Sequence, residues 1–126
     1  MLERKENIVA VKADAFSDRV VKMAQYLQRE KYEKVMSSQI LRSGTSIGAN
    51  IAESKYAHSR ADFVSKLTIS LKEANETRFW LDKLYSGDYI TEKQYHSMLS
   101  DNEEIIKLLM AITKTVRNKS VFYDNA

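Results

Sequence analysis

Polar residues recur at intervals of three or four in the middle of the chain, and two glutamates follow in a later segment. One side of a helix through the first stretch would carry, in order, Arg42, Ser46, Asn50 and Glu53. Glu73 and Glu76 form a carboxylate pair, which could in principle perform acid–base chemistry. No histidine or activated nucleophile accompanies them. We therefore favour a structural network in which Arg42 pairs with a glutamate and fixes the helix register.

The two histidines do not fit a metal site. A di-metal site in a helical bundle requires Glu-x-x-His pairs, and neither His58 nor His96 has a glutamate three residues before it. The sequence contains no cysteine, which excludes thiolate ligands, thiol nucleophiles and disulfides. We expect no metal, no cofactor and no catalytic residue.

The segment GTSIG (residues 44–48) places Gly44 and Gly48 four residues apart. A phosphate-binding loop would need Lys-Ser or Lys-Thr next, and the nucleophile elbow of serine hydrolases needs a strand–turn–helix context. Here the glycines lie within an expected helix. Small residues at this spacing let a neighbouring helix approach closely, so the segment predicts tight helix packing and not an enzyme.

Composition and periodicity predict an all-α chain. Its 126 residues suit one domain, and the absence of proline with only three glycines leaves room for few loops. Apolar residues recur with helical spacing over residues 8–30, 33–57, 59–86 and 91–118, followed by a frayed tail at 119–126. The connections are short, so the expected architecture is an antiparallel up-down-up-down four-helix bundle with long helices.

Local signals mark the ends of the last two helices. Ser59 with Asp62 and Thr91 with Gln94 have the spacing of capping boxes, which predicts a helix start at each. Gly87 is expected to end the third helix as the usual left-handed residue.

The net charge is only +3, but basic residues cluster in two segments. From Ile105 to Ala126 four basic residues accompany one acidic residue, and residues 34–60 carry a similar excess. Such clusters could meet a polyanion, although cations near the end of the last helix also complement its dipole. The candidate nucleic-acid contacts are Lys55, Arg60, Lys107, Lys114, Arg117 and Lys119.

Nothing in the sequence directs the chain to a membrane. The first residues lack the apolar segment of a signal peptide, and no run of about 18 apolar residues exists. We expect a cytoplasmic protein.

Ile69 and Trp80 lie off the main apolar stripe of the third helix. Tryptophan is enriched at interface hot spots, so both residues are candidates for an oligomer interface. A second contact within a broad bundle would explain Trp80 equally well, and the sequence leaves both interpretations open.

A pattern of polar and apolar residues runs through the stretch from Ser38 to Leu84: Gln39, Arg42, Ser46, Ile47, Asn50, Ile51 and Glu53, then Lys72, Glu73, Glu76 and Thr77. With this pattern the stretch resembles the four-helix-bundle family named for proteins encoded in intervening sequences of bacterial 23S rRNA genes. The second and third helices resemble the family closely, and the outer helices resemble it in pattern only.

This resemblance implies an antiparallel bundle that assembles into a ring, typically a homopentamer. The family includes the accessory protein of diversity-generating retroelements, a basic pentamer that binds a reverse transcriptase and nucleic acid, whereas most members have no established activity. We therefore expect a non-enzymatic oligomeric binding module that contacts RNA or a nucleic-acid-processing protein. The alternative is a purely structural or protein-binding oligomer without nucleic-acid contact.

Overall fold

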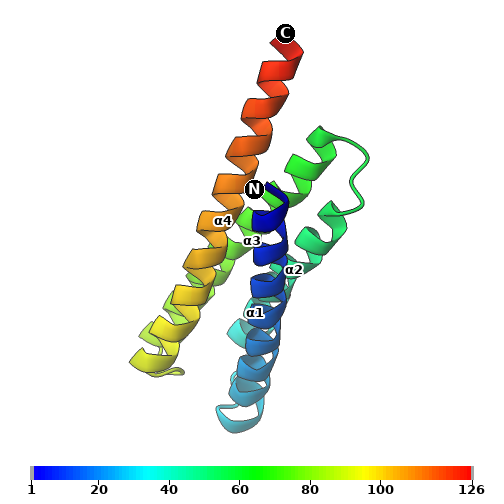
Figure 1. Ribbon diagram of the computed structural model, residues 1–126. Coiled ribbons are helices and arrows are strands. Elements are labelled where there is room, and N and C mark those ends of the chain that lie inside the picture. The colour runs from blue at the N-terminus through cyan, green and yellow to red at the C-terminus, as the bar shows by residue number, and fades with distance from the viewer. Residues whose placement is uncertain (1, 126) are drawn as a thin grey trace.

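The chain folds into four helices in a computed structural model that describes the backbone of residues 2–125 and the side chains of residues 3–118. The helices are α1 (Leu2–Glu30), α2 (Val35–Ser54), α3 (Arg60–Ser86) and α4 (Glu92–Asn125). They run alternately up and down (Figure 1), which confirms the predicted antiparallel four-helix bundle. None of the described helices is long and apolar enough to cross a bilayer.

Each helix packs against two neighbours around one core. α1 and α3 both contact α2 and α4. The α2–α3 turn lies at the same end as the N-terminus of α1, and the other two turns lie at the opposite end (Figure 1). The largest fully buried side chains are those of Phe16, Leu27, Ile40, Ile47, Leu67, Leu81, Leu84, Ile105, Leu109 and Ile112.

The two glycines of α2 lie against α1. A Cβ atom at Gly44 would stand 2.8 Å from both γ-carbons of Val20. A Cβ atom at Gly48 would stand 3.1 Å from the Ser17 hydroxyl oxygen and 3.5 Å from the Ala13 carbonyl oxygen. The contact at Gly44 thus leaves no room for a side chain, which is the close approach expected from the spacing of small residues.

A buried carboxylate starts α2. The Oε1 atom of Glu33 accepts hydrogen bonds from the backbone N–H groups of Val35 and Met36 at 2.9 and 2.8 Å. Its Oε2 atom accepts one from Ser37 at 2.8 Å. The carboxylate satisfies three of the N–H groups that the first turn leaves without helical partners. α2 therefore begins at Val35, after Glu33, and not at residue 33 as the periodicity suggested.

The predicted capping box at Thr91 is complete, whereas at Ser59 the side chain caps the helix but Asp62 accepts from His58 instead of Ser59. The backbone N–H of Asp62 donates to the Ser59 hydroxyl oxygen at 3.0 Å, and the His58 N–H donates to the Asp62 carboxylate at 3.1 Å. The Thr91 N–H donates to the Gln94 side-chain oxygen at 2.8 Å, and the Gln94 N–H donates to the Thr91 hydroxyl oxygen at 3.1 Å.

The C-terminal end of α3 differs from the expectation. Gly87 has φ −85°, and the left-handed residue is Asp88, with φ 62°. The Tyr89 N–H donates to the Leu84 carbonyl oxygen at 2.9 Å, which closes the turn one residue later than predicted. Aspartate tolerates the left-handed region better than most residues, so the turn does not need glycine there.

The helix boundaries differ at three further places. α1 begins at Leu2 because no glycine or proline interrupts the segment before residue 8. α2 ends at Ser54, and the N–H groups of residues 55–57 instead bond to carbonyls three residues earlier. α4 continues to Asn125, although the side chains of the expected tail at 119–126 lie outside the described residues.

Candidate functional site

Arg42 joins α2 to α3 through two carboxylates. Its Nη1 atom lies 3.0 Å from Glu73 Oε2, and its Nη2 atom contacts Glu76 Oε2. The Trp80 indole N–H donates to the same Glu76 oxygen at 3.3 Å. The Arg42 side chain is 49% exposed and that of Glu73 is 17% exposed, so this network lies at the edge of the helix interface. The expected pairing of Arg42 with a glutamate is therefore present.

The other polar residues of the motif do not join this network. The Ser46 hydroxyl donates to the Arg42 carbonyl oxygen at 2.6 Å, and the Asn50 amide donates to the Ser46 carbonyl oxygen at 2.8 Å. Glu53 pairs with Lys66 of α3 at 3.2 Å, and Gln39 is exposed. Ser46 thus lies inside a continuous helix and bonds to it, which is unlike a nucleophile at a strand–helix turn.

A seam of buried hydroxyl groups between α2 and α3 was not predicted. The hydroxyl oxygens of Ser43 and Thr77 lie 2.9 Å apart, and the Ser70 hydroxyl donates to the Ile47 carbonyl oxygen at 2.8 Å. All three side chains are fully buried. The sequence indicates this seam only weakly, because small polar residues at these positions look like the solvent-exposed edge of an apolar stripe. Thr77, which the resemblance singled out, belongs to this seam.

Removing the Arg42 network should have a modest effect. Loss of one partner from a buried ion pair costs about 3–5 kcal/mol, but a half-exposed pair contributes about 1 kcal/mol or less. We expect Arg42→Met to lower the free energy of unfolding in urea by about 1 kcal/mol, with Lys93→Met as the exposed control. A double-mutant cycle with Glu73→Gln measures the coupling. A loss above about 3 kcal/mol would show that Arg42 is effectively buried, for instance by a second copy.

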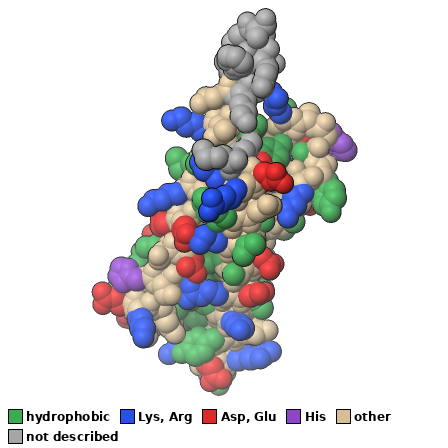
Figure 2. Space-filling view, viewed as in Figure 1, with side chains coloured by type: hydrophobic (Ala, Val, Ile, Leu, Met, Phe, Trp, Pro, Cys, Tyr) green, Lys and Arg blue, Asp and Glu red, His purple; other side chains and the backbone are tan. Residues whose placement is uncertain are grey.

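The basic candidates from separate segments meet at the end with the α2–α3 turn. Arg60 and Arg117 line one surface hollow together with Thr68 and Ile69, and the Arg117 guanidinium donates to the Thr68 hydroxyl at 3.4 Å. Lys55 and Arg60 line an adjoining hollow, which also includes Glu6. On the face seen in Figure 2, blue side chains are frequent toward the upper end of the molecule, with red ones among them.

The remaining basic candidates lie on α4. Lys107 and Lys114 are exposed, and at 100° per residue they fall within about 80° of Arg117 around the helix. They therefore extend the basic end along one side of α4. The side chain of Lys119 lies beyond the described residues.

The two interface candidates differ in exposure. Ile69 is exposed, whereas Trp80 is partly buried, packs against the core and bonds to Glu76. The exposed aromatic residue of α3 is Phe79, which the sequence did not single out. Its ring is half exposed and lies edge-on to Trp80 at 5.0 Å, with the Lys83 ammonium 5.3 Å from its centroid. Trp80 thus has the contact within the chain that the sequence left open.

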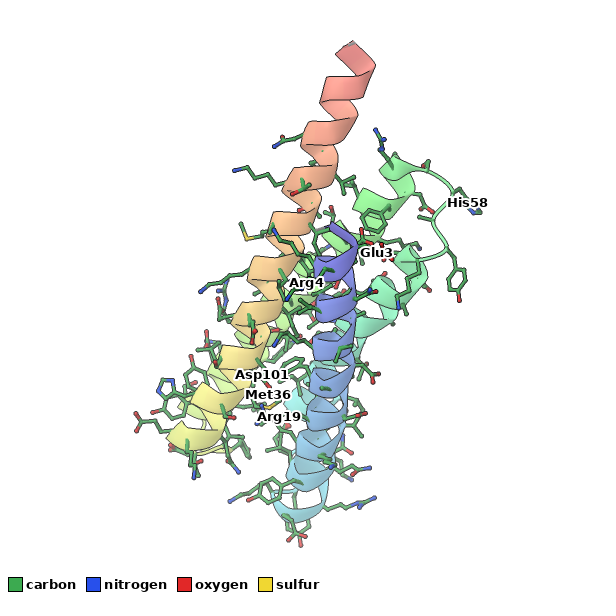
Figure 3. All side chains as sticks on the ribbon, viewed as in Figure 1. Glu3, Arg4, Arg19, Met36, His58 and Asp101 are labelled. Atoms are coloured by element: carbon green, nitrogen blue, oxygen red, sulfur yellow. The ribbon has the colours of Figure 1, made fainter. Side chains whose placement is uncertain are left out.

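The described residues contain no group of three His, Cys, Asp or Glu side chains that could hold a metal ion. His58 points outward from the α2–α3 turn (Figure 3), and His96 lies 3.7 Å from Glu92 on the surface of α4. Arg19 of α1 and Asp101 of α4 point toward one another and pair at 2.5 Å. The Arg19–Asp101 pair thus links α1 to α4, whereas the His96–Glu92 contact lies within α4.

A tyrosine links the two helices that flank the α3–α4 turn. The Tyr95 hydroxyl donates to Asp82 at 2.5 Å, and its ring stacks on Tyr85 with centroids 4.5 Å apart. This hydrogen bond, together with partial burial, raises the pKa of Tyr95. The tyrosine therefore stays protonated and links α3 to α4.

Comparison with known proteins places this arrangement in context. Residues 5–111 match the family model described as 23S rRNA-intervening sequence protein. A crystal structure from Bacteroides thetaiotaomicron, described as a protein with unknown function from the S23 ribosomal protein family, is similar over 87% of this chain and 98% of that one. The two chains are 55% identical, and the TM-score is 0.87. No curated protein matches the chain.

Proposed function

Because the chain belongs to the family of 23S rRNA-intervening sequence proteins, we propose that it is a non-enzymatic, oligomeric binding module that contacts RNA in the cytoplasm. The observation that carries this proposal is the meeting of Lys55, Arg60 and Arg117 from three segments of the chain at one end of the bundle. Cations gathered on one surface attract the phosphate backbone irrespective of base sequence.

The basic end has a shape suited to a strand of RNA. Its two hollows adjoin at Arg60, so a backbone crossing them would pass Lys55, Arg60 and Arg117 in turn. Lys107 and Lys114 continue the basic surface along α4. Glu6 lowers the positive potential in the second hollow, which favours moderate and salt-sensitive affinity over tight binding.

The test is a binding titration with a fluorescent RNA at several salt concentrations. The variant combines Lys55→Gln, Arg60→Gln and Arg117→Gln; the control combines Arg29→Gln, Lys31→Gln and Lys93→Gln, exposed cations in or beside the two turns at the opposite end. Both variants lose the same net charge. We expect the first to lose about tenfold in affinity and about 2–3 units of salt slope, and the control to change little. Equal losses in both variants would refute a localised interface.

A purely protein-binding oligomer is the second candidate, and the exposed apolar surface of α3 favours it. Ile69 and Phe79 both face solvent in the single chain. Leaving such area wet costs roughly 25 cal/mol per Å², which burial against another protein removes. If the protein does not bind RNA even at low salt, where electrostatic attraction is strongest, this candidate is favoured.

Assembly can be measured directly. We expect light scattering at micromolar concentration to give the mass of a homo-oligomer, with a pentamer favoured by the family resemblance. Head-to-tail contacts of one kind close into a ring when the rotation fits. Combining Ile69→Glu with Phe79→Glu should reduce the mass to that of the monomer, because charges are poorly tolerated in an interface core. An unchanged mass would place the interface elsewhere.

A further inference from the structure

The α2–α3 turn carries an aromatic side chain with no packing role that explains it. Tyr56 is 84% exposed and lies between Lys55 and the exposed His58, with Arg60 at the start of α3. An aromatic ring gains little from this position in the folded chain, because most of its apolar surface stays in water.

The turn presents this ring on an ordered backbone. The N–H groups of Lys55, Tyr56 and Ala57 donate to the carbonyls of residues 52–54 at 3.0–3.4 Å. The next N–H, that of His58, donates to the Asp62 carboxylate at 3.1 Å. Successive backbone donors on both sides of Tyr56 are therefore satisfied, so the backbone that carries the ring is ordered before any partner arrives.

We propose that the basic end binds single-stranded RNA, with one base stacked on Tyr56 while the neighbouring phosphates contact Lys55, Arg60 and Arg117. This inference rests on the proposed function and adds the class of nucleic acid. Aromatic rings beside a cationic groove bind single strands, because unpaired bases expose their faces. Bases within a duplex are already stacked on each other and offer no free face to Tyr56.

A matched control exists at the other end of the bundle. Tyr32 is 83% exposed and follows Lys31, but it lies in the α1–α2 turn. The two tyrosines are alike in exposure and in immediate basic neighbours. They differ in that Lys55 and Ala57, on either side of Tyr56, line the hollow that contains Arg60, whereas Tyr32 precedes Glu33 and has φ 54°.

The experiment measures the affinity of the full chain for a short fluorescent single-stranded RNA and for a duplex of equal length. We expect the parent to prefer the single strand, and Tyr56→Ala to weaken single-strand binding by roughly five- to a hundredfold without altering the salt slope. Tyr56→Trp should retain binding, and Tyr32→Ala should leave it unchanged. Circular dichroism should show both alanine variants to be folded, because both side chains are exposed.

The outcomes separate this inference from the proposed function. If the triple glutamine variant loses affinity but Tyr56→Ala does not, RNA binding stands and base stacking on Tyr56 is refuted. Equal affinity of the parent for the duplex refutes the inference in the same way. If neither variant affects binding, or if the parent binds no RNA, both proposals fall.

Discussion

Replacing Gly44 with leucine is expected to destabilise the protein by more than about 3 kcal/mol, since overpacking costs 1–3 kcal/mol even where some adjustment is available. The Cβ atom alone would lie 2.8 Å from both γ-carbons of Val20, and Val20 is itself fully buried. α1 and α2 would have to separate, which would disturb the core on both sides. Urea denaturation followed by circular dichroism gives the free energy of unfolding.

Gly48 provides the matched comparison. Its Cβ atom would meet the Ser17 hydroxyl at 3.1 Å, and this partly exposed side chain can move. Because alanine is favoured over glycine in a helix by about 1 kcal/mol, we expect Gly48→Ala to be nearly neutral. Gly44→Ala should be clearly destabilising, and Val20→Ala should relieve part of that loss. If Gly44→Ala melts within a degree of the parent, the two helices do not approach as closely as described.

Glu33→Ala should cost about 2–4 kcal/mol, because capping groups contribute up to 2 kcal/mol and hydrogen bonds to charged groups contribute more than neutral ones. The substitution leaves three backbone N–H groups of α2 without their acceptor at a site where Ser37 is fully buried. Differential scanning calorimetry measures the loss.

Two further variants test whether the hydrogen bonds of Glu33 or its charge stabilise the start of α2. Glu33→Gln retains one acceptor oxygen but turns an NH₂ group toward the N–H of Ser37, so its stability should fall between that of the parent and that of Glu33→Ala. Glu30→Ala, at an exposed position just before the same turn, should have little effect. A similar cost for Glu30→Ala and Glu33→Ala would mean that the local charge matters and the cap does not.

Local signals predicted the starts of α3 and α4 well, but not the left-handed residue that follows α3. The boxes at Ser59 and Thr91 involve residues three apart, so their hydrogen bonds depend little on the rest of the chain. The left-handed residue after α3 depends on which N–H closes onto Leu84, and that bond selects Asp88 over Gly87. The presence of glycine at position 87 could not show which of the two residues would adopt the left-handed conformation.

The polar contacts between helices were only partly predictable. The motif indicated that Arg42 pairs with a glutamate, but it did not show that Glu53 pairs with Lys66 instead. The sequence indicated only an approximate helix start at residue 33 and not the capping role of Glu33, because the burial of this residue depends on how the chain returns after α1. The basic end also required the fold, since Lys55, Arg60 and Arg117 come together only when α2, α3 and α4 are placed.

The buried hydroxyl groups between α2 and α3 restrict how these helices can slide. An apolar surface has nearly equal affinity for several alignments, whereas the buried Ser43 and Ser70 hydroxyls would lose their bonds to Thr77 and Ile47 if α3 moved. A slide by one turn would shift α3 by about 5.4 Å along the bundle axis. It would break the Ser43–Thr77 contact and carry Arg60 away from Arg117. The interior of the α2–α3 pair thereby sets the spacing of charges at a surface several turns away.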